Sequence, residues 1–187
     1  MPRWVLGFVF LFTFIGTSVL AAELYTREQE PELYCLAENI YWESHPDNLA
    51  GRAAVADVVL NRVKDSRFPN TICEVVKQGL IKESWRTKGK KVPDEERVYT
   101  PIRNMCQFSW WCDGKPDVIL NKQGEDWRKI QELAYKIVTN GYLRGISDNS
   151  THYHAPYVHP EWNQRFEKKG RIGLHLFYIK YHKLSQL

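Results

Sequence analysis

The clearest pattern of apolar and polar positions lies in the first third of the chain. Apolar residues recur at helical spacing over two neighbouring segments, which predicts one helix from about Glu32 to Glu43 and a second from about Asn48 to Lys64. The residues between them, Ser44-His45-Pro46-Asp47-Asn48, are typical of a turn. We therefore expect a pair of apolar helices joined by a short connection.

Weaker patterns follow this helix pair. Thr71 is a good N-cap for a short helix that runs to Gln78, before Gly79. Residues 80–104 are highly charged and predict an irregular excursion or a weak hairpin, whose charges form a solvated face or border a substrate cleft. A further helix is expected over Glu125–Asn140, with Gly141 as its C-cap.

The last third of the chain contains the strand signals. Thr151–Ala155 alternates and predicts a short strand, residues 156–160 form a loop, and Arg171–Lys180 predicts a closing strand. The balance is mainly helical with a small β-sheet, so the fold class expected is α+β.

An apolar leader precedes these elements. Arg3 is its only charge, Trp4–Leu20 is an apolar run, and Val19-Leu20-Ala21 fits the small-residue rule for signal-peptide cleavage. We expect residues 1–21 to be a signal peptide, residues 22–31 a polar tether, and residues 32–187 one catalytic domain. Because the run approaches membrane-spanning length, an uncleaved membrane anchor is the alternative. Either outcome places the domain outside the cytoplasm.

Four cysteines fit an oxidising compartment. Cys106 and Cys112 flank one short loop, so we expect them to pair, which leaves Cys35 to pair with Cys73. The alternatives are four reduced thiols or a zinc site, although no Cys-x-x-Cys pair is present.

Composition narrows the class of partner. A net charge of +4 is too mild to indicate nucleic-acid binding, which needs a clustered basic face. Seven tryptophans and ten tyrosines are many for 187 residues. Most should pack in the core, but aromatic rings also line carbohydrate-binding clefts by stacking on the apolar faces of sugar rings.

The candidate chemistry begins with one acid. Glu43 falls at the exit of one apolar helix and faces the start of the next. An acid in such surroundings can have a raised pKa and act as a general acid. From the spacing alone, a solvated residue at a helix end remains the competing interpretation.

A family resemblance adds to this interpretation. The chain resembles the SleB-type cell wall hydrolases, a spore cortex-lytic family, from about Cys35 to Phe177. The matching stretches occur in the family's order: Ile40–Glu43, Gly51–Val63 around Leu60-Asn61-Arg62-Val63, Phe68–Thr71, Cys106–Gly114 and Thr151–Ala155. The sequence departs from the family next to the acid, because Ser44-His45-Pro46-Asp47 stands where the family often has Ala-Arg-Gly-Glu.

The resemblance implies a lysozyme-like α+β domain that degrades peptidoglycan. The implied reaction is cleavage of the bond between N-acetylmuramic acid and N-acetylglucosamine, by a lytic transglycosylase or a muramidase, with Glu43 as the single general acid/base. Glycosidases usually use two carboxylates, and Asp47 is the only nearby second acid. An N-acetylmuramoyl-L-alanine amidase and a non-catalytic peptidoglycan-binding module are the alternatives.

Further candidate residues lie in or beside the matching stretches. We expect substrate to be bound by Tyr41, Asp47, Gln107, Ser109, Asp113, Tyr153 and His154. For several of these a local role is the competing interpretation: Asp47 as a helix N-cap or first-turn acid, Ser109 and Asp113 as loop-fixing residues, and the histidine as a packed core residue.

No cofactor is expected. His152 and His154 would share one face of a strand, but two histidines are too few for a catalytic zinc site. The expected partner is peptidoglycan, with no nucleic acid and with membrane contact only through the leader. We expect a monomer that is exported to the periplasm or cell envelope.

The leader gives a first testable prediction. Cleavage after Ala21 should leave an exported protein that lacks the first 21 residues, because the small-residue motif ends there. Intact-mass measurement of the periplasmic or secreted protein checks this. Recovery of full-length, membrane-bound protein alone would favour the anchor.

Overall fold

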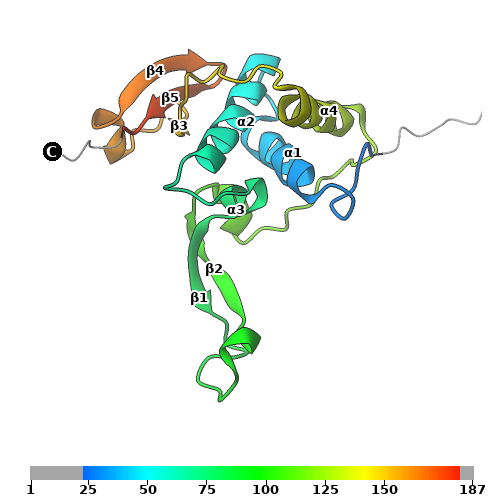
Figure 1. Ribbon diagram of the computed structural model, residues 1–187, viewed down its shortest axis with the longest axis vertical. Coiled ribbons are helices and arrows are strands. Elements are labelled where there is room, and N and C mark those ends of the chain that lie inside the picture. The colour runs from blue at the N-terminus through cyan, green and yellow to red at the C-terminus, as the bar shows by residue number, and fades with distance from the viewer. Residues whose placement is uncertain (1–22, 182–187) are drawn as a thin grey trace, which may run out of the picture.

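The computed structural model describes residues 23–181 (Figure 1). The expected signal peptide therefore lies outside the described residues. The helices are α1 (Pro31–Ser44), α2 (Leu49–Lys64), α3 (Ile72–Val76) and α4 (Glu125–Asn140), with short 3-10 turns at Asp94–Glu96, Ser109–Cys112 and Glu161–Gln164. The strands are β1 (Gly79–Glu83), β2 (Tyr99–Cys106), β3 (His152–His154), β4 (Glu167–Ile172) and β5 (His175–Ile179).

The predicted α+β class is confirmed, and the three long helices agree with their sequence patterns to within one residue. Three helix ends carry residue types that favour caps. The side chain of Asn48 accepts a hydrogen bond from the Gly51 N–H at the start of α2, and Thr71 does the same for Glu74 in α3. Gly141 ends α4 in the left-handed conformation.

The core lies where α1 meets α2, α3 and α4. Leu36 and Ile40 on α1 are fully buried, as is Val59 on α2. Trp127 of α4 is also buried and meets the ring of Tyr34 edge-on, with ring centroids 5.5 Å apart. Burial of each such side chain contributes about 1.5–3 kcal/mol, so α1 is held firmly along its length.

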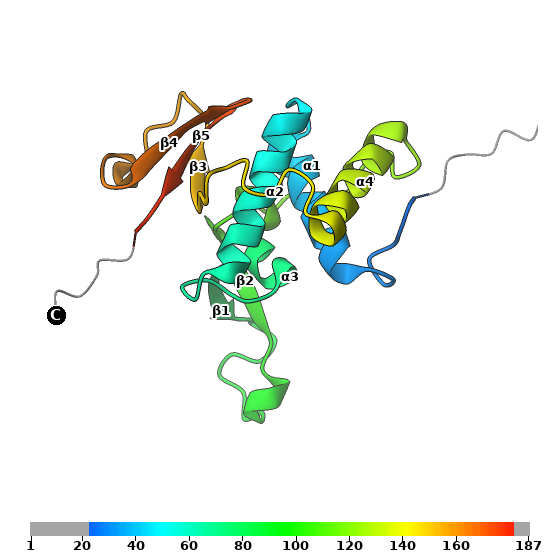
Figure 2. The same cartoon turned by 45° about the horizontal axis from the view of Figure 1, so that its top comes forward.

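Two small antiparallel sheets flank this helical body. The sheet of β3, β5 and β4 lies on the side of α2 that faces away from α1 and α4, as both views show (Figure 1, Figure 2). The hairpin of β1 and β2 projects from the body instead. In the described residues, no helix is long and apolar enough to cross a bilayer.

Two sequence expectations are refined. Of the two alternatives for residues 80–104, the hairpin is confirmed, because β1 and β2 pair with Glu83 opposite Tyr99 and enclose one charged loop. The single closing strand expected over Arg171–Lys180 is wrong, since the chain turns at Gly173 and forms a hairpin of β4 and β5. Gly173 has φ of 56°, a left-handed conformation that a continuous strand does not contain.

Both expected disulfides are present. Cys35 on α1 is bonded to Cys73 on α3, and Cys106 at the end of β2 is bonded to Cys112. The first bond joins segments 38 residues apart, whereas the second spans only six. Chain entropy therefore favours the first as the stabilising bond.

Removing each pair tests this difference. Cys35→Ser with Cys73→Ser should lower the free energy of unfolding by about 3–4 kcal/mol, because the unfolded chain regains the entropy of a long loop. The matched control, Cys106→Ser with Cys112→Ser, should lower it by about 2 kcal/mol. Urea unfolding without reductant measures both, and a larger loss for the short loop would contradict the entropic account.

Candidate active site

Glu43 stands in the last turn of α1 and lines a cleft of about 400 Å³. The rigid packing of α1 fixes the position of its side chain. The rest of the lining comes from α1, α2 and β5, from the segment after β2, and from β3 with the loop that follows: Trp42, Arg62, Gln107, Phe108, Ser109, Trp110, Tyr153, His154, Ala155, Tyr157, Val158 and His175. Within residues 23–181, Glu43 is the only carboxylate among the lining residues.

Tyr153 of β3 makes the direct contact with this acid. Its hydroxyl donates a hydrogen bond to Glu43 Oε2 at 3.1 Å. The ring packs against Phe108, Phe177 and His175, with centroids 5.0–6.5 Å apart, so the hydroxyl has little freedom to move. Burial and the nearby Glu43 raise the pKa of Tyr153, which therefore stays a donor at neutral pH.

The position of β3 depends on polar groups of α2. Arg62 Nε donates to the carbonyl of Thr151 at 2.8 Å, and the Asn61 amide donates to the carbonyl of Ser150 at 3.0 Å. One turn earlier, the buried carboxylate of Asp57 accepts hydrogen bonds from Arg144 and from Ser147. The helix thus aligns the segment that carries Tyr153 with the acid on α1.

Burial raises the pKa of Glu43 above its usual range. The hydrogen bond from Tyr153 and the positive charge of Arg62 oppose this rise, and burial is the larger effect. Arg62 is itself buried, which lowers its pKa, although Glu43 counteracts the change. Burial therefore favours the protonated form of the carboxyl group. The Tyr153 hydroxyl and the Arg62 charge stabilise the carboxylate form.

Arg62 also has spare hydrogen-bonding capacity. Its guanidinium lies over the rings of Phe68 and Phe108, 5.2 and 5.1 Å from their centroids. Its Nη1 is buried and has no hydrogen-bond partner among the described residues. A cation held between aromatic faces beside an acid is well placed to stabilise negative charge on that acid.

A further part of the cleft wall is built from the segment that follows β2. Gln107 and Ser109 line the cleft there, beside Trp110. Trp110 Nε1 donates to the side-chain oxygen of Asn39 at 3.1 Å, and the Trp110 ring stacks on Trp42 of α1. These contacts hold a polar and aromatic wall against the helix that carries Glu43.

The structure gathers some of the predicted residues and separates others. Glu43, Gln107, Ser109, Tyr153 and His154 line one cleft. Three other predicted residues do not line it, and each has a local role. Tyr41 packs against Trp42, His45 and Trp127. Asp113 accepts from the N–H of Lys115 in its own loop, which is the loop-fixing alternative.

Asp47 joins two turns by accepting hydrogen bonds from their backbone N–H groups. Its Oδ1 accepts from the Asn48 N–H at 2.7 Å, and its Oδ2 accepts from the Leu174 N–H at 2.9 Å. The carboxylate fills a niche between two glycines, since a Cβ added at Gly51 or Gly173 would overlap it. The N-cap of α2 is Asn48, so the N-cap alternative for Asp47 is wrong. Asp47 instead ties the turn before α2 to the turn between β4 and β5.

The two histidines share one face of β3, as the alternation predicts. Both rings lie close to Trp162, with centroids 5.3 and 5.5 Å away. His154 is also stacked on Tyr178 and exchanges a hydrogen bond with its hydroxyl at 3.1 Å. Burial and nearby cations lower the pKa of His152 to about 4. In residues 23–181, no group of three or more acidic, histidine or cysteine side chains is arranged to hold a metal.

Sequence reasoning missed Arg62 and His175 as cleft residues. Arg62 carried a usable signal, because a charged residue inside the apolar stretch Val58–Val63 has to be buried with a partner. His175 carried none, since its approach to the cleft depends on the β4–β5 turn. It packs against Tyr153 and lies 3.8 Å from Asp47.

Comparisons with known proteins agree with this architecture. The family profile described as Cell Wall Hydrolase matches residues 47–178. The fold is similar to the catalytic domain of the germination-specific lytic transglycosylase SleB from Bacillus anthracis, with 24% identity, a TM-score of 0.52, and coverage of 83% of this chain and 97% of that one. The fold is also similar to the catalytic domain of the Bacillus cereus SleB protein, with 23% identity, a TM-score of 0.50, and coverage of 88% of this chain and 99% of that one. No curated protein sequence gives a significant match.

The contact between Tyr153 and Glu43 gives a prediction that needs no substrate. Tyr153→Phe keeps the packed ring but removes a donor that lowers the pKa of Glu43, so that pKa should rise further. Carboxyl ¹³C shifts across a pH titration measure it, with Glu43→Gln to identify the resonance. Tyr157→Phe alters the same cleft away from this hydrogen bond and should leave the pKa unchanged. Equal shifts in both variants would contradict the assignment.

Proposed function

The chain belongs to the cell wall hydrolase family, and on that premise we propose that it is an enzyme that cleaves the bond between N-acetylmuramic acid and N-acetylglucosamine in peptidoglycan, with Glu43 as general acid/base. The observation that carries the proposal is the position of Glu43. It is the sole carboxylate lining the cleft in the described residues, and burial raises its pKa. A group with these properties can deliver a proton to a leaving oxygen near neutral pH.

A single carboxylate favours the lytic transglycosylase reaction. Protonated Glu43 gives its proton to the glycosidic oxygen as the bond to the muramoyl C1 breaks, and an oxocarbenium-like centre develops there. The resulting carboxylate then takes the proton from the muramoyl 6-hydroxyl while that oxygen bonds to C1. The sugar's own hydroxyl takes the place of water, an anhydro ring closes, and Glu43 is protonated again.

The neighbours of Glu43 suit the carboxylate form that arises between these steps. The Tyr153 hydroxyl already donates to Oε2, and the charge of Arg62 stabilises the anion. Both groups are fixed before substrate arrives, Tyr153 by ring packing and Arg62 by its bond to Thr151. Little reorganisation is then needed when the proton leaves.

The cleft walls suit a sugar polymer. The exposed ring of Tyr157 and the partly exposed ring of Trp42 offer faces for the apolar sides of pyranose rings. Gln107 and Ser109 supply an amide and a hydroxyl for N-acetyl groups and sugar hydroxyls. These assignments of substrate contacts belong to the proposal.

A muramidase that activates water remains the nearest alternative reaction. It would need a second carboxylate, and Asp47 is the candidate from the sequence. Both Asp47 oxygens accept backbone hydrogen bonds, and the residue does not line the cleft. This observation favours the transglycosylase. An amidase would depend on a metal or a nucleophile, so insensitivity to a chelator together with cleaved glycan strands separates the two activities.

Family membership and two disulfides indicate an extracytoplasmic location. We extend this to export into the periplasm or cell envelope, where peptidoglycan is accessible.

Replacing the acid tests the mechanism. Glu43→Gln keeps the shape and can still accept from Tyr153, but it cannot donate the proton. Turnover of purified sacculi should fall about 10²–10⁴-fold, while the thermal midpoint stays close to that of the wild type. Release of soluble muropeptides measures turnover. Retained activity in Glu43→Gln would assign the acid elsewhere.

Asp47→Asn is the matched control. It should lower the thermal midpoint, because the hydrogen bond from the Leu174 N–H to this side chain weakens. The products of the reaction should be the same as those of the wild type. Mass spectrometry should find muropeptides lighter by one water that end in anhydro-muramic acid. Reducing ends of ordinary mass would make the enzyme a muramidase, and free stem peptides with intact glycan strands would make it an amidase.

A further inference from the structure

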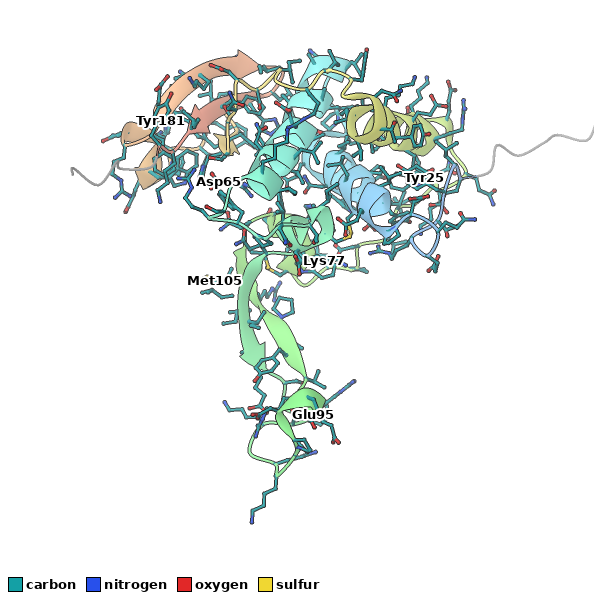
Figure 3. The ribbon with its side chains drawn as sticks, in the orientation of Figure 1. Tyr25, Asp65, Lys77, Glu95, Met105 and Tyr181 are labelled. Atoms are coloured by element: carbon teal, nitrogen blue, oxygen red, sulfur yellow. A yellow bond between two sulfur atoms is a disulfide. The ribbon has the colours of Figure 1, made fainter. Side chains whose placement is uncertain are left out.

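The projecting hairpin, residues 79–106 and here called the arm, has no role in the mechanism above. In both ribbon views it extends away from the helical body (Figure 1, Figure 2). Figure 3 shows Glu95 near its far end and Met105 near its root. The arm contributes no side chain to the cleft around Glu43. Its size and position therefore call for a different explanation.

The arm exposes apolar side chains along its length. Trp85 is 80% exposed, which is unusual for the largest apolar residue type. Other large apolar residues of the arm that are exposed are Leu80, Ile81, Val98, Tyr99 and Met105. An exposed apolar group of this extent on an isolated projection is typical of a binding surface.

Positive charge accompanies these residues. The arm holds seven basic and four acidic residues, a net charge of +3 out of the chain's +4. Arg97 forms ion pairs with both Glu83 and Asp94, so a single cation is shared by two of the acids. Lys82, Arg86 and Lys88 make no ion pair in the part of the chain that the structure describes, and they line a hollow of about 530 Å³ together with Trp85.

The arm is joined directly to the cleft. β2 continues into Gln107 and Ser109 of the cleft wall, and the Gln107 N–H donates to the carbonyl of Gln78 at 2.8 Å. The Cys106–Cys112 disulfide fixes the end of β2 to the turn that carries Trp110. A polymer bound in the cleft is thus within reach of a surface that is attached to the cleft wall.

We propose that the arm is a second, non-catalytic binding surface for peptidoglycan, in which Trp85 stacks on a sugar ring and the cations Lys82, Arg86 and Lys88 bind carboxylates of the peptide stems. The proposal rests on the proposed function for its ligand. Peptidoglycan offers the matching chemistry, since its pyranose rings have apolar faces and its stems carry free carboxylates. A contact outside the cleft would keep the enzyme on an insoluble polymer between cleavage events.

An anionic bilayer is the main rival for a surface with tryptophan and lysine. Asp94, Glu95 and Glu96 form the 3-10 turn of the arm's loop, with Glu95 near its far end (Figure 3). Acids there would be repelled by anionic headgroups. Leu80 and Ile81 in β1 and Met105 near the root of β2 are exposed along the strands of the arm, away from Glu95 near its far end (Figure 3). Apolar positions spread over the arm in this way suit an extended polymer better than a flat membrane.

Binding to purified sacculi tests the proposal in a Glu43→Gln background, where the polymer is not digested. Adding Trp85→Ala should weaken co-sedimentation with sacculi about fivefold, with an unchanged thermal midpoint because the side chain is exposed. Lys88→Glu should weaken binding most at low salt. Lys168→Glu, on exposed β4, makes the same change in net charge and should have no effect.

Activity separates this proposal from the proposed function. With Glu43 intact, Trp85→Ala should slow digestion of sacculi but cleave short soluble glycan fragments at the wild-type rate. Unchanged sacculus binding by Trp85→Ala would overturn the arm proposal and leave the mechanism intact. A wild type that binds sacculi through Trp85 but cleaves nothing would overturn only the mechanism. If Trp85 were needed for binding to phosphatidylglycerol vesicles and the protein did not bind sacculi, the ligand of the arm would be a membrane and the arm proposal would be overturned.

Discussion

The hydrogen bond from the Tyr153 hydroxyl to Glu43 is the contact on which the site depends. It joins the last turn of α1 to β3, two segments 110 residues apart. A distance of 3.1 Å is kept only if both segments are held firmly. The core holds α1, and α2 holds β3 through Arg62 and Asn61. The helical core and the α2–β3 contacts together hold the Glu43 carboxyl group beside the Tyr153 hydroxyl.

Burial of charge is the second constraint. A carboxyl group taken out of water favours its protonated form, and a guanidinium beside it limits how far that preference goes. Glu43 and Arg62 are thus a buried pair in which the charge of each group opposes the effect of burial on the pKa of the other. Without Arg62, the pKa of Glu43 would be higher still. Without Glu43, Arg62 would be a buried charge with no acid beside it.

How well each part of the molecule could be predicted depends on how far apart in the sequence its interacting residues lie. Local periodicity and caps place α1, α2 and α4, and a family motif indicates Glu43. The strand expected over Arg171–Lys180 failed because alternation alone does not reveal a turn at Gly173. A charge inside an apolar helix marks Arg62 as buried but does not say which groups it meets, and the cleft position of His175 depends on the β4–β5 turn, which no local pattern encodes. The three long helices could thus be predicted almost completely, whereas of the residues that line the cleft the sequence indicated Glu43, Gln107, Ser109, Tyr153 and His154.

The niche of Asp47 has an evolutionary consequence. The carboxylate occupies space that a side chain at Gly51 or at Gly173 would need, and it fastens the β4–β5 turn to the entrance of α2. Loss of the acid would free position 51 for a side chain, and a methyl group gained at position 51 would displace the acid. Position 173 keeps its glycine in either case, because its φ of 56° disfavours a side chain whatever the space. Positions 47 and 51 should therefore covary, although neither Asp47 nor Gly51 lines the cleft around Glu43 in the described residues.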